Sequence, residues 1–433
     1  MTNTTTRLPL TDGLEARLPE LEALYRDLHR HPELAFQERR TAAVIAAELR
    51  AQGWDTTEHV GGTGVVGVLR SGDGPVVLLR ADMDGLPVRE ATGLPYASTD
   101  TAVDPDGEEV PVMHACGHDM HVTCLLGATG QLAAHRDAWR GTVVALFQPA
   151  EENGEGAAAM AADGFLDRFP RPEVCLGQHV GPLPVGVAVT RPGPVMSASD
   201  SFRVRLFGRG GHGSSPEHTV DPVVLAAAVV MRLQTVVSRE IGANQSAVVT
   251  VGSIHAGTRQ NVIPDEAELK VNIRTTDARV RGRVLSAVER IIRAEAAASG
   301  APKDPEITPL TALPLTVNDA QATERAVAGL RSALGDAAVL PLPWPLAGSE
   351  DFGNFGTAFG VPSVFWHFGG ADPELFGEDG IAALMSGELP AGLPTNHSPY
   401  YAPVPGPTID RGVRAMLGAA AQWVGTDRLP PAR

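Results

Sequence analysis

The chain has 433 residues, of which 43% are hydrophobic and 20% are charged, a composition typical of soluble globular proteins. A single hydrophobic core stops growing well below this length, so we expect two domains. Lysine and arginine total 35 against 51 aspartates and glutamates, a formal net charge of −16 that argues against nucleic acid and anionic membranes as partners.

Targeting and redox features indicate a cytoplasmic protein. The N-terminus, Met1–Thr4, has no basic region followed by an apolar run, so we expect no signal peptide. No run of about 18 apolar residues predicts a membrane span. The three cysteines, Cys116, Cys124 and Cys175, are too few for a disulfide framework, and their odd number fits a reducing compartment.

The first quarter of the chain predicts two helices and then two strands. Apolar residues recur at helical spacing over 14–30 and 41–52. The β-branched runs 64–69 and 76–79 are bounded by Gly and Pro, so they predict two neighbouring strands.

The second of these strands runs directly into an acidic segment that contains Asp82 and Asp84. Ligands bind at the carboxyl ends of strands in open α/β sheets. Alternate residues of a strand point to opposite sides, so one aspartate can face a site while the other orients a ligand from behind it. A solvated Asp-x-Asp-Gly turn explains the same segment equally well.

The densest chemistry lies at residues 113–121, where a thiol, three imidazoles and a carboxylate surround Gly117. Cys116 and His118 form a C-x-H pair, and thiolate and imidazole are ligands that zinc and similar divalent ions prefer. Glycine lets the backbone turn tightly between them. Three histidines within eight positions, in a chain that has 13, favour a metal site over unrelated surface histidines beside a core cysteine.

A buried helix is predicted over 123–135, and a fully apolar strand over 143–147 leads to Glu151 and Glu152. Adjacent side chains at a strand end point different ways, so one carboxylate can bind a metal while the other takes a proton from the attacking water. Most acidic pairs are only solvated, but a position after a buried strand favours function here. The short apolar run 174–176 places His179 at the end of another strand.

The middle of the chain changes to alternating strands and predicts a small α+β domain. Strands are predicted over 201–207, 247–252 and 267–274, with helices over 222–237 and 281–298. His212 lies in a glycine-rich loop. From the residues alone, His212 is typical of a mobile loop and Arg274 of a surface strand.

The chain then returns to the first domain. Residues 313–319 predict the crossing, 321–334 and 410–424 helices, and 361–367 an apolar strand. Glu350 and Asp351 lie in a Gly-flanked loop and are expected to shape the wall of the site. His397 lies on a loop bracketed by Pro394 and Pro399.

Together these segments resemble a known family, the aminoacylase and hippurate-hydrolase (N-acyl-L-amino acid amidohydrolase) branch of the two-metal metallopeptidases, which includes plant auxin-conjugate hydrolases. The resemblance covers nearly the whole chain and is specific for the family, but much less so for the substrate. The segments that carry it are LHRHPEL (28–34), RADMDGLPV (80–88), MHACGHDMH (113–121), LFQPAEE (146–152), GRGGHGSSPE (208–217), GTRQNVIP (257–264), GSEDF (348–352) and PTNHSP (394–399).

The resemblance implies an α/β catalytic domain with a mixed sheet, of the phosphorylase/hydrolase-like kind, and an inserted α+β (ferredoxin-like) lid that makes a homodimer. The implied limits are 1–197 and 309–433 for the catalytic domain and 198–308 for the lid.

The resemblance also implies two divalent metal ions per chain, zinc or manganese first and nickel or cobalt as alternatives, with Cys116 bridging them. Glu151 would be the general base and acid. His212 would stabilise the oxyanion, either in its own chain or across the dimer interface. Asp82 or Asp84 would support the ligands, and Asn261 and Arg274 would hold the substrate carboxylate. The implied metal ligands are Cys116, His118, Glu152, His179 and His397.

The implied function is cleavage of the amide bond of small N-acyl amino acids, such as hippurate-like or N-acetyl compounds. Two alternatives remain: a dipeptidase or carboxypeptidase of the same family, and a non-catalytic binding descendant. The cysteine in the C-x-H pair favours the acyl-amino-acid branch, and the intact Glu151–Glu152 pair favours an enzyme. Residues 369–393 and the Glu217-His218 pair depart from the family pattern near the expected entrance, which leaves the substrate open.

Overall fold

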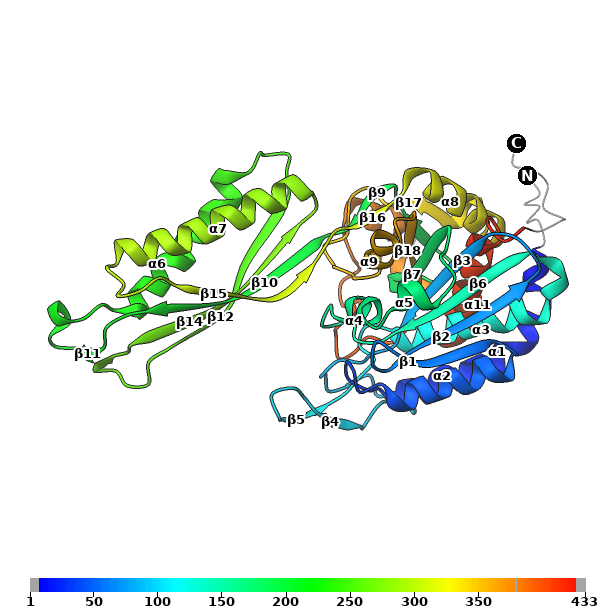
Figure 1. Ribbon diagram of the computed structural model, residues 1–433, viewed down its shortest axis with the longest axis horizontal. Coiled ribbons are helices and arrows are strands. Elements are labelled where there is room, and N and C mark those ends of the chain that lie inside the picture. Colours follow the sequence, from blue (N-terminus) through cyan, green and yellow to red (C-terminus); the bar gives the residue numbers. More distant parts are fainter. Residues whose placement is uncertain (1–7, 378–379, 426–433) are drawn as a thin grey trace. The chain divides into compact units, whose positions relative to one another are not determined.

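The structure is a computed structural model that describes residues 8–377 and 380–425 (Figure 1). The expectation about a signal peptide falls on Met1–Thr4, which lie outside the described residues. The chain divides into two compact units. The first contains the residues up to 195, 317–344 and those from 351 onward, and the second contains 196–316 and 345–350. The catalytic and lid roles, with limits at 197/198 and 308/309, stay a prediction.

The first unit is built on a mixed sheet that has eight strands in the described part of the chain. β3, β6 and β7 are mutually parallel and β18 is parallel to β7, whereas β1, β2 and β6 pair antiparallel. The predicted α/β class with a mixed sheet is confirmed. The strand order is β1 (Asp55–Val60), β2 (Gly64–Ser71), β6 (Gly141–Gln148), β3 (Val76–Asp82), β7 (Val174–Pro184), β18 (Ser363–Ala371), β8 (Ala188–Thr190) and β17 (Val339–Pro341).

One prediction about this sheet is wrong. The strands predicted at 64–69 and 76–79 do not pair, because β6 lies between them. β6 is antiparallel to β2 on one side and parallel to β3 on the other. The parallel pair needs a long crossover, which the helix after β3 supplies. Local apolar patterns identify strands but do not reveal which strand inserts between two others.

Both faces of this sheet are covered, which explains why its central strands are continuously apolar. Val77, Leu79 and Ala81 of β3 point into the main core, and Leu78 and Arg80 point to the opposite face. The helices of the main core are α1 (Leu14–Arg30), α2 (Arg39–Ala51), α3 (His118–Ala134), α8 (Ala320–Leu334) and α11 (Pro405–Ala420). The remaining helices of the unit are α4 (Gly156–Ala162), α5 (Phe165–Arg168), α9 (Gly353–Phe359) and α10 (Gly380–Ser386).

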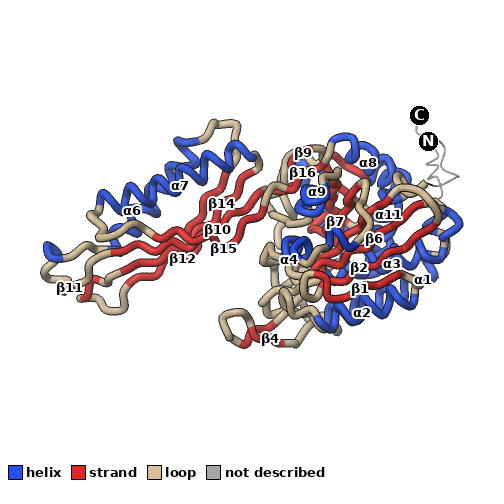
Figure 2. Tube along the Cα trace, viewed as in Figure 1, coloured by secondary structure: helices blue, strands red, loops and turns tan. Residues whose placement is uncertain are grey.

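The second unit is a four-stranded antiparallel sheet with two helices on one face (Figure 2). Its strands are ordered β12 (Ala247–Ala256), β14 (Glu266–Thr275), β10 (Ala198–Phe207) and β15 (Glu306–Leu313). Its helices α6 (Pro222–Thr235) and α7 (Ala278–Ala298) bury one apolar face each in a separate core. Six short strands complete the set of strands in the described residues: β4 (Thr101–Val103), β5 (Glu109–Pro111), β9 (Gly193–Met196), β11 (Gly211–His212), β13 (Val262–Ile263) and β16 (Thr316–Asn318).

Helix α6 continues as a π-turn over Val236–Glu240. Among the described residues, the combined helix Pro222–Glu240 is the one that is long and apolar enough to cross a membrane, with a mean hydropathy of 1.4. Leu225, Val229 and Leu233 of this helix are buried in the core of the second unit. A helix that packs one apolar face onto a sheet meets the same length and composition criteria as a span.

The contact between α8 and α11 depends on two glycines and generates a prediction. A Cβ added at Gly418 would lie 2.6 Å from both the Ala333 Cβ and the Gly329 oxygen. Gly418→Ala should therefore lower the free energy of unfolding by about 1–3 kcal/mol through overpacking. The matched control is Gly282→Ala in α7, where an added Cβ meets nothing within 4 Å, and this change should stabilise by about 0.5–1 kcal/mol. Urea unfolding measures both, and equal effects would contradict the close helix contact.

Candidate metal centre

The structure brings the five predicted ligands together in the first unit. Cys116 and His118 lie at the start of α3, His179 on β7, Glu152 just after β6, and His397 in the loop before α11. β3, β6 and β7 are parallel neighbours, and the carboxyl ends of parallel strands meet at one edge of a sheet. The short segments that follow these strands therefore converge.

Gly117 makes the approach of the Cys116–His118 turn to β7 possible. Its φ is 86°, in the left-handed region that glycine adopts at little cost. A Cβ at this position would lie 2.5 Å from the Val180 Cγ1. Helix α3 begins at His118, five residues before the predicted start at residue 123, because Gly117 is its N-cap residue. His118 and His121 consequently lie on the first turn of α3.

One of the two ring nitrogens of His118 has no hydrogen-bond partner in the described part of the chain. Its Nδ1 lies 3.1 Å from the Asp84 Oδ1, which fixes the proton on Nδ1. Its Nε2 is buried and has no hydrogen-bond partner among the described residues. The nearest carboxylate oxygens are 3.6 Å away on Asp82, 3.8 Å on Glu152 and 3.9 Å on Glu151.

Glu152 has a carboxylate oxygen that also lacks a hydrogen-bond partner among the described residues. Its Oε1, which faces the His118 Nε2, is also buried without a hydrogen-bond partner in the described part of the chain. Its Oε2 lies 3.4 Å from the His397 Nε2, and its backbone N–H donates to the Asp84 Oδ2 at 3.0 Å. Buried polar atoms without partners are costly. Once the His118 Nε2 has lost its proton, its lone pair and the facing carboxylate oxygen fit a divalent cation between them.

Cys116 lies against the remaining ligands. Its Sγ is 3.4 Å from the His179 Nε2, and the donor atoms of Cys116, Glu152 and His397 all lie within 4.8 Å of one another. Glu151, Glu152 and His118 form a second group that meets the same limit. The thiol therefore lies next to ligands from several elements, as a bridging ligand would.

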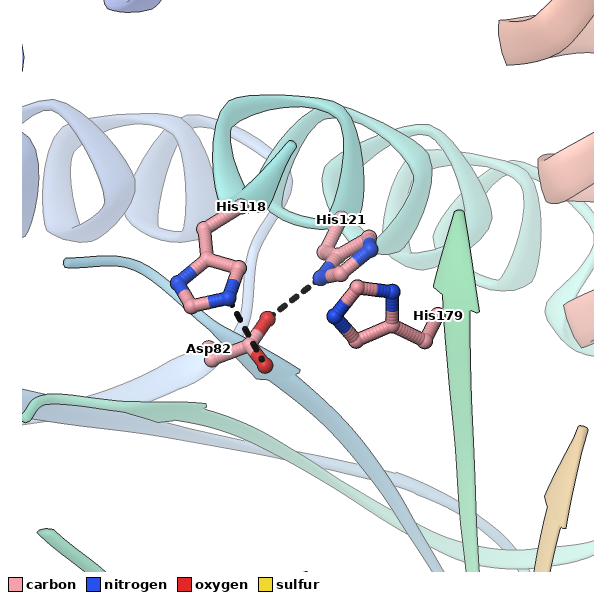
Figure 3. A group of neighbouring side chains, drawn as sticks. All are labelled: Asp82, His118, His121 and His179. Carbon is pink, nitrogen blue, oxygen red and sulfur yellow. Dashed lines mark hydrogen bonds and ion pairs between the residues drawn. The ribbon is translucent and has the colours of Figure 1, made fainter. Parts of the chain in front are cut away.

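Figure 3 shows a further group of possible ligands: Asp82, His118, His121 and His179. His121 is the member of this group that was not predicted from the sequence. Its Nδ1 lies 2.5 Å from the Asp82 Oδ1, and its Nε2 accepts the Val180 N–H at 2.8 Å. Because both ring nitrogens are engaged, His121 orients the backbone of β7 at Val180 and is not free to bind a metal. Its i+3 spacing from His118 on one helix was the signal that could have identified it.

His121 and His179 both contact the backbone of one residue, Val180. The Val180 carbonyl accepts the His179 Nδ1–H at 2.7 Å, and the Val180 N–H is the group that His121 holds. Burial and the neighbouring His121 keep the pKa of His179 well below its usual value. His179 is therefore neutral at pH 7, and its Nε2 lone pair faces Cys116.

Asp82 and Asp84 lie behind the ligands. Asp84 contacts His118 and the Glu152 backbone, as described above. Asp82 pairs with the Arg80 Nη1 at 2.7 Å. Burial opposes its ionisation, but the charges of Arg80, His118 and His121 hold the pKa of Asp82 well below its ordinary value.

Arg80 and Gln148 were not predicted from the sequence. Arg80 is fully buried and donates from Nε to the Gln148 Oε1 at 2.9 Å and from Nη2 to the Asp351 Oδ1 at 3.2 Å. Asp351 also accepts from the Gln148 Nε2 and from the Ala157 N–H. A polar residue at the end of an otherwise apolar strand was the available signal. This network fixes the segment between β6 and α4.

The predicted residues of the lid lie in the second unit and in two separate places. His212 on β11 pairs with Val262 on β13, next to Asn261, and both His212 and Asn261 are exposed. Arg274 lies on β14, opposite Ser199 at the start of β10, and donates to the Ala347 carbonyl at 2.8 Å. The structure brings His212 and Asn261 together and leaves Arg274 apart from them.

Comparison with known proteins gives one family. The model of the peptidase family M20/M25/M40 matches residues 78–379. The chain belongs to this family. The hippurate hydrolase of Campylobacter jejuni is 37% identical over 338 residues, which cover 78% of this chain and 85% of that protein. The thermostable carboxypeptidase 1 of Saccharolobus solfataricus is 34% identical over 357 residues, 80% of this chain and 86% of that protein.

A solved structure is similar to this protein over nearly the whole length of both chains. The Bacillus subtilis YXEP protein, a dinuclear metal binding peptidase from the M20 family, superposes with a TM-score of 0.71 at 29% identity and covers 94% of this chain and 98% of its own. These findings confirm the resemblance seen in the sequence, and they make this M20 protein a metal-dependent amidohydrolase.

Proton release on metal binding is the prediction that follows from this site. The Cys116 and Glu152 hydrogen bonds raise the pKa of His397 to about 10. Burial opposes protonation of His118, but the Asp82 charge and the Asp84 hydrogen bond raise its pKa well above the usual value. Burial and the Glu152 charge raise the pKa of the Cys116 thiol. At pH 7 the metal-free protein therefore holds protons on all three groups.

Divalent metals bind neutral imidazole and thiolate, so binding at pH 7 should release more than one proton per chain. The apparent affinity should rise as the pH rises from 6 towards about 10, where His397 is already half neutral. Calorimetric titration of the metal-free protein in two buffers of different ionisation enthalpy counts the protons. His397→Ala should release about one proton fewer. A heat of binding that is independent of the buffer would contradict the assignment.

Proposed function

We propose that this M20 enzyme hydrolyses the amide bond between an acyl group and an amino acid, using two divalent metal ions. The observation that carries the proposal is the pair of facing, buried donor atoms on His118 and Glu152, neither of which has a hydrogen-bond partner in the described residues. Glu151 lies directly beside this pair. The proposed ligands are Cys116, His118, Glu152, His179 and His397.

Two divalent ions at these ligands supply positive charge that polarises the scissile carbonyl and lowers the pKa of the attacking water. The thiolate of Cys116 suits zinc, and manganese, nickel and cobalt are alternatives by family resemblance. Cys116 is the proposed bridge, since its sulfur has neighbours in more than one group of donors. Asp84 keeps the His118 proton on Nδ1, and Asp82 holds His121 in place behind His179.

Glu151 is the proposed proton shuttle. It is only 6% exposed, and its Oε2 lies 3.9 Å from the His118 Nε2, so it borders the metal centre without being the closest oxygen. It would accept a proton from the attacking water and return it to the amine that leaves. A good leaving amine requires that proton, because an amide nitrogen departs poorly as an anion.

Exchanging each glutamate for glutamine separates these roles. Glu151→Gln keeps the shape but cannot accept the proton, so kcat should fall by about three orders of magnitude or more while the metal content and KM change little. Glu152→Gln should instead lower the metal content at equal free metal. Elemental analysis and steady-state kinetics measure the two effects. A Glu151→Gln variant with wild-type kcat, or with the metal loss expected for Glu152→Gln, would show the roles to be wrong.

A homodimer through the second unit is also proposed. Ser199, opposite Arg274, lies at one end of β10, and Phe207, five residues before His212 in the chain, lies at the other. Eight residues of extended strand span about 26 Å, so a small substrate cannot contact Arg274 and His212 of one unit together. We propose that a second copy of the chain supplies both His212 and Asn261, so that His212 stabilises the oxyanion while Asn261 and Arg274 hold the substrate carboxylate.

The surface that would make this dimer is edge strand β12 with helix α6. β12 ends the four-stranded sheet, and α6 exposes Val224 (65%) and Met231 (71%). Light scattering should give about twice 45.4 kDa, and Met231→Glu should shift the mass towards the monomer. The matched control is Leu310→Glu on β15, an exposed residue (47%) at the opposite edge. A wild-type protein with the monomer mass would refute the proposal.

The substrate class rests on the relatives, which include a hippurate hydrolase and a carboxypeptidase. The metal-loaded protein should be tested on N-acetyl, N-benzoyl and indoleacetyl amino acids and on dipeptides. We expect kcat/KM for the best N-acyl amino acid to exceed that for dipeptides by about tenfold or more, a difference of about 1.4 kcal/mol in transition-state binding. Metal chelation should abolish the activity. Faster cleavage of dipeptides would favour the peptidase alternative. No turnover of any amide would favour a binding protein.

A further inference from the structure

The segment that carries Glu151 and Glu152 contains an unusual backbone conformation. Ala150 has a φ of 51°, in the left-handed region that a residue with a Cβ rarely adopts. Among the described residues, the others without glycine's freedom that have positive φ are Phe36, His59 and His397. Ala150 directly precedes the proposed proton shuttle and is completely buried. Its conformation therefore sets the direction in which the chain delivers Glu151.

A buried carboxylate from a distant part of the chain holds this conformation. The Ala150 N–H donates to the Glu38 Oε1 at 2.9 Å, and the Glu38 Oε2 accepts the Thr63 hydroxyl at 2.5 Å. Glu38 is 0% exposed. It occupies the N-cap position of α2, but its side chain makes no hydrogen bond to that helix. One of its carboxylate oxygens accepts a hydrogen bond from the turn after β6 instead.

The turn is fixed on both sides of Glu151. The Ala150 carbonyl accepts the Gly156 N–H at 3.0 Å, which closes the loop behind the two glutamates. The Glu152 N–H donates to Asp84 at 3.0 Å. Glu38 thus holds the N–H of the residue before Glu151, and Asp84 holds the N–H of the residue after it. Without Glu38, the buried Ala150 N–H would lose its acceptor, and the strained conformation would lose one of the contacts that compensate it.

We infer that Glu38 is a positioning residue for Glu151, which it aims at the metal centre by holding Ala150 in the left-handed conformation. The inference rests on the proposed role of Glu151. Burial and the Asp84 charge raise the pKa of Glu38 to about 7, and both the acid and the carboxylate have an oxygen that accepts the Ala150 N–H. Glutamine also has such an oxygen, since the Thr63 hydroxyl can turn to accept from its amide.

The test compares Glu38 variants in two backgrounds. Glu38→Met fills the same space without an acceptor, and a misdirected Glu151 should lower kcat by about 10- to 100-fold. KM and the metal content at saturating metal should change less than about threefold, because the substrate and metal ligands remain. Glu38→Gln should restore most of kcat. In the Ala150→Gly background, a φ near 51° carries no penalty. The factor by which Glu38→Met lowers kcat should therefore be at least about fivefold smaller in that background than in the wild-type background.

The control for general destabilisation is Asp319→Ala, which removes another carboxylate that accepts a backbone N–H, at the start of α8. If Asp319→Ala lowers the unfolding midpoint as much as Glu38→Met and lowers kcat as much, Glu38 is merely structural and the inference fails. An equal loss of kcat in both Ala150 backgrounds also overturns it. Glu38→Asp, which retracts the oxygen by one carbon, replaces Glu38→Met in the same comparison if the latter does not fold.

Failure of the proposed function is separable from failure of this inference. Urea unfolding of the metal-free variants reports the Glu38–Ala150 link without any catalytic readout, and Glu38→Met should destabilise less in the Ala150→Gly background. If that coupling is present but Glu151→Gln hydrolyses substrates at the wild-type rate, the role of Glu151 is wrong. If Glu151→Gln is inactive but the coupling is absent, the positioning role of Glu38 is wrong.

Discussion

The concentration of negative charge at the carboxyl edge of the sheet is the constraint on which the rest of the first unit depends. Asp82, Asp84, Glu151 and Asp351 are all nearly or fully buried there, and carboxylates taken from water need an opposite charge or several donors. Arg80, the one buried arginine in the described part of the chain, compensates part of this charge. Two divalent ions would compensate the rest, so metal binding and the stability of the edge are linked.

The backbone around this edge is shaped as closely as the side chains. Ala150 and His397 adopt positive φ without being glycines, and each lies at or next to a proposed functional group. Strain of this kind persists only where surrounding contacts hold it. The buried contacts of Glu38 and Asp84 provide that restraint on one side of the site. The exposed loop of His397 is tied through its backbone N–H to the Ala115 carbonyl, next to Cys116.

The proposed ligands could be predicted from local patterns. Glu152 and His179 come with apolar runs that indicate strands, Cys116 and His118 form a C-x-H pair, and His397 lies on a loop bracketed by prolines. The sequence could not reveal which residues far apart in the chain contact one another. Glu38 and Ala150 are 112 positions apart, and no local pattern connects them. The insertion of β6 between β2 and β3 is likewise set by sheet pairing. His121 was visible in its motif, but the choice between ligand and support depends on what each ring nitrogen contacts.

The division of the chain into units has a consequence for its synthesis. Residues 196–316 are continuous and carry nearly all of the second unit, whereas the first unit needs segments on both sides of them. His397 follows His179 by 218 residues, which take about 10 to 40 s to translate at 5–20 residues per second. For most of that interval the chain has four of the five proposed ligands, and α11 and β18 are still missing from the core. The second unit can fold on the ribosome, whereas the proposed metal centre must wait for His397, so its thiol and imidazoles are open to a wrong metal or an oxidant until translation is nearly finished.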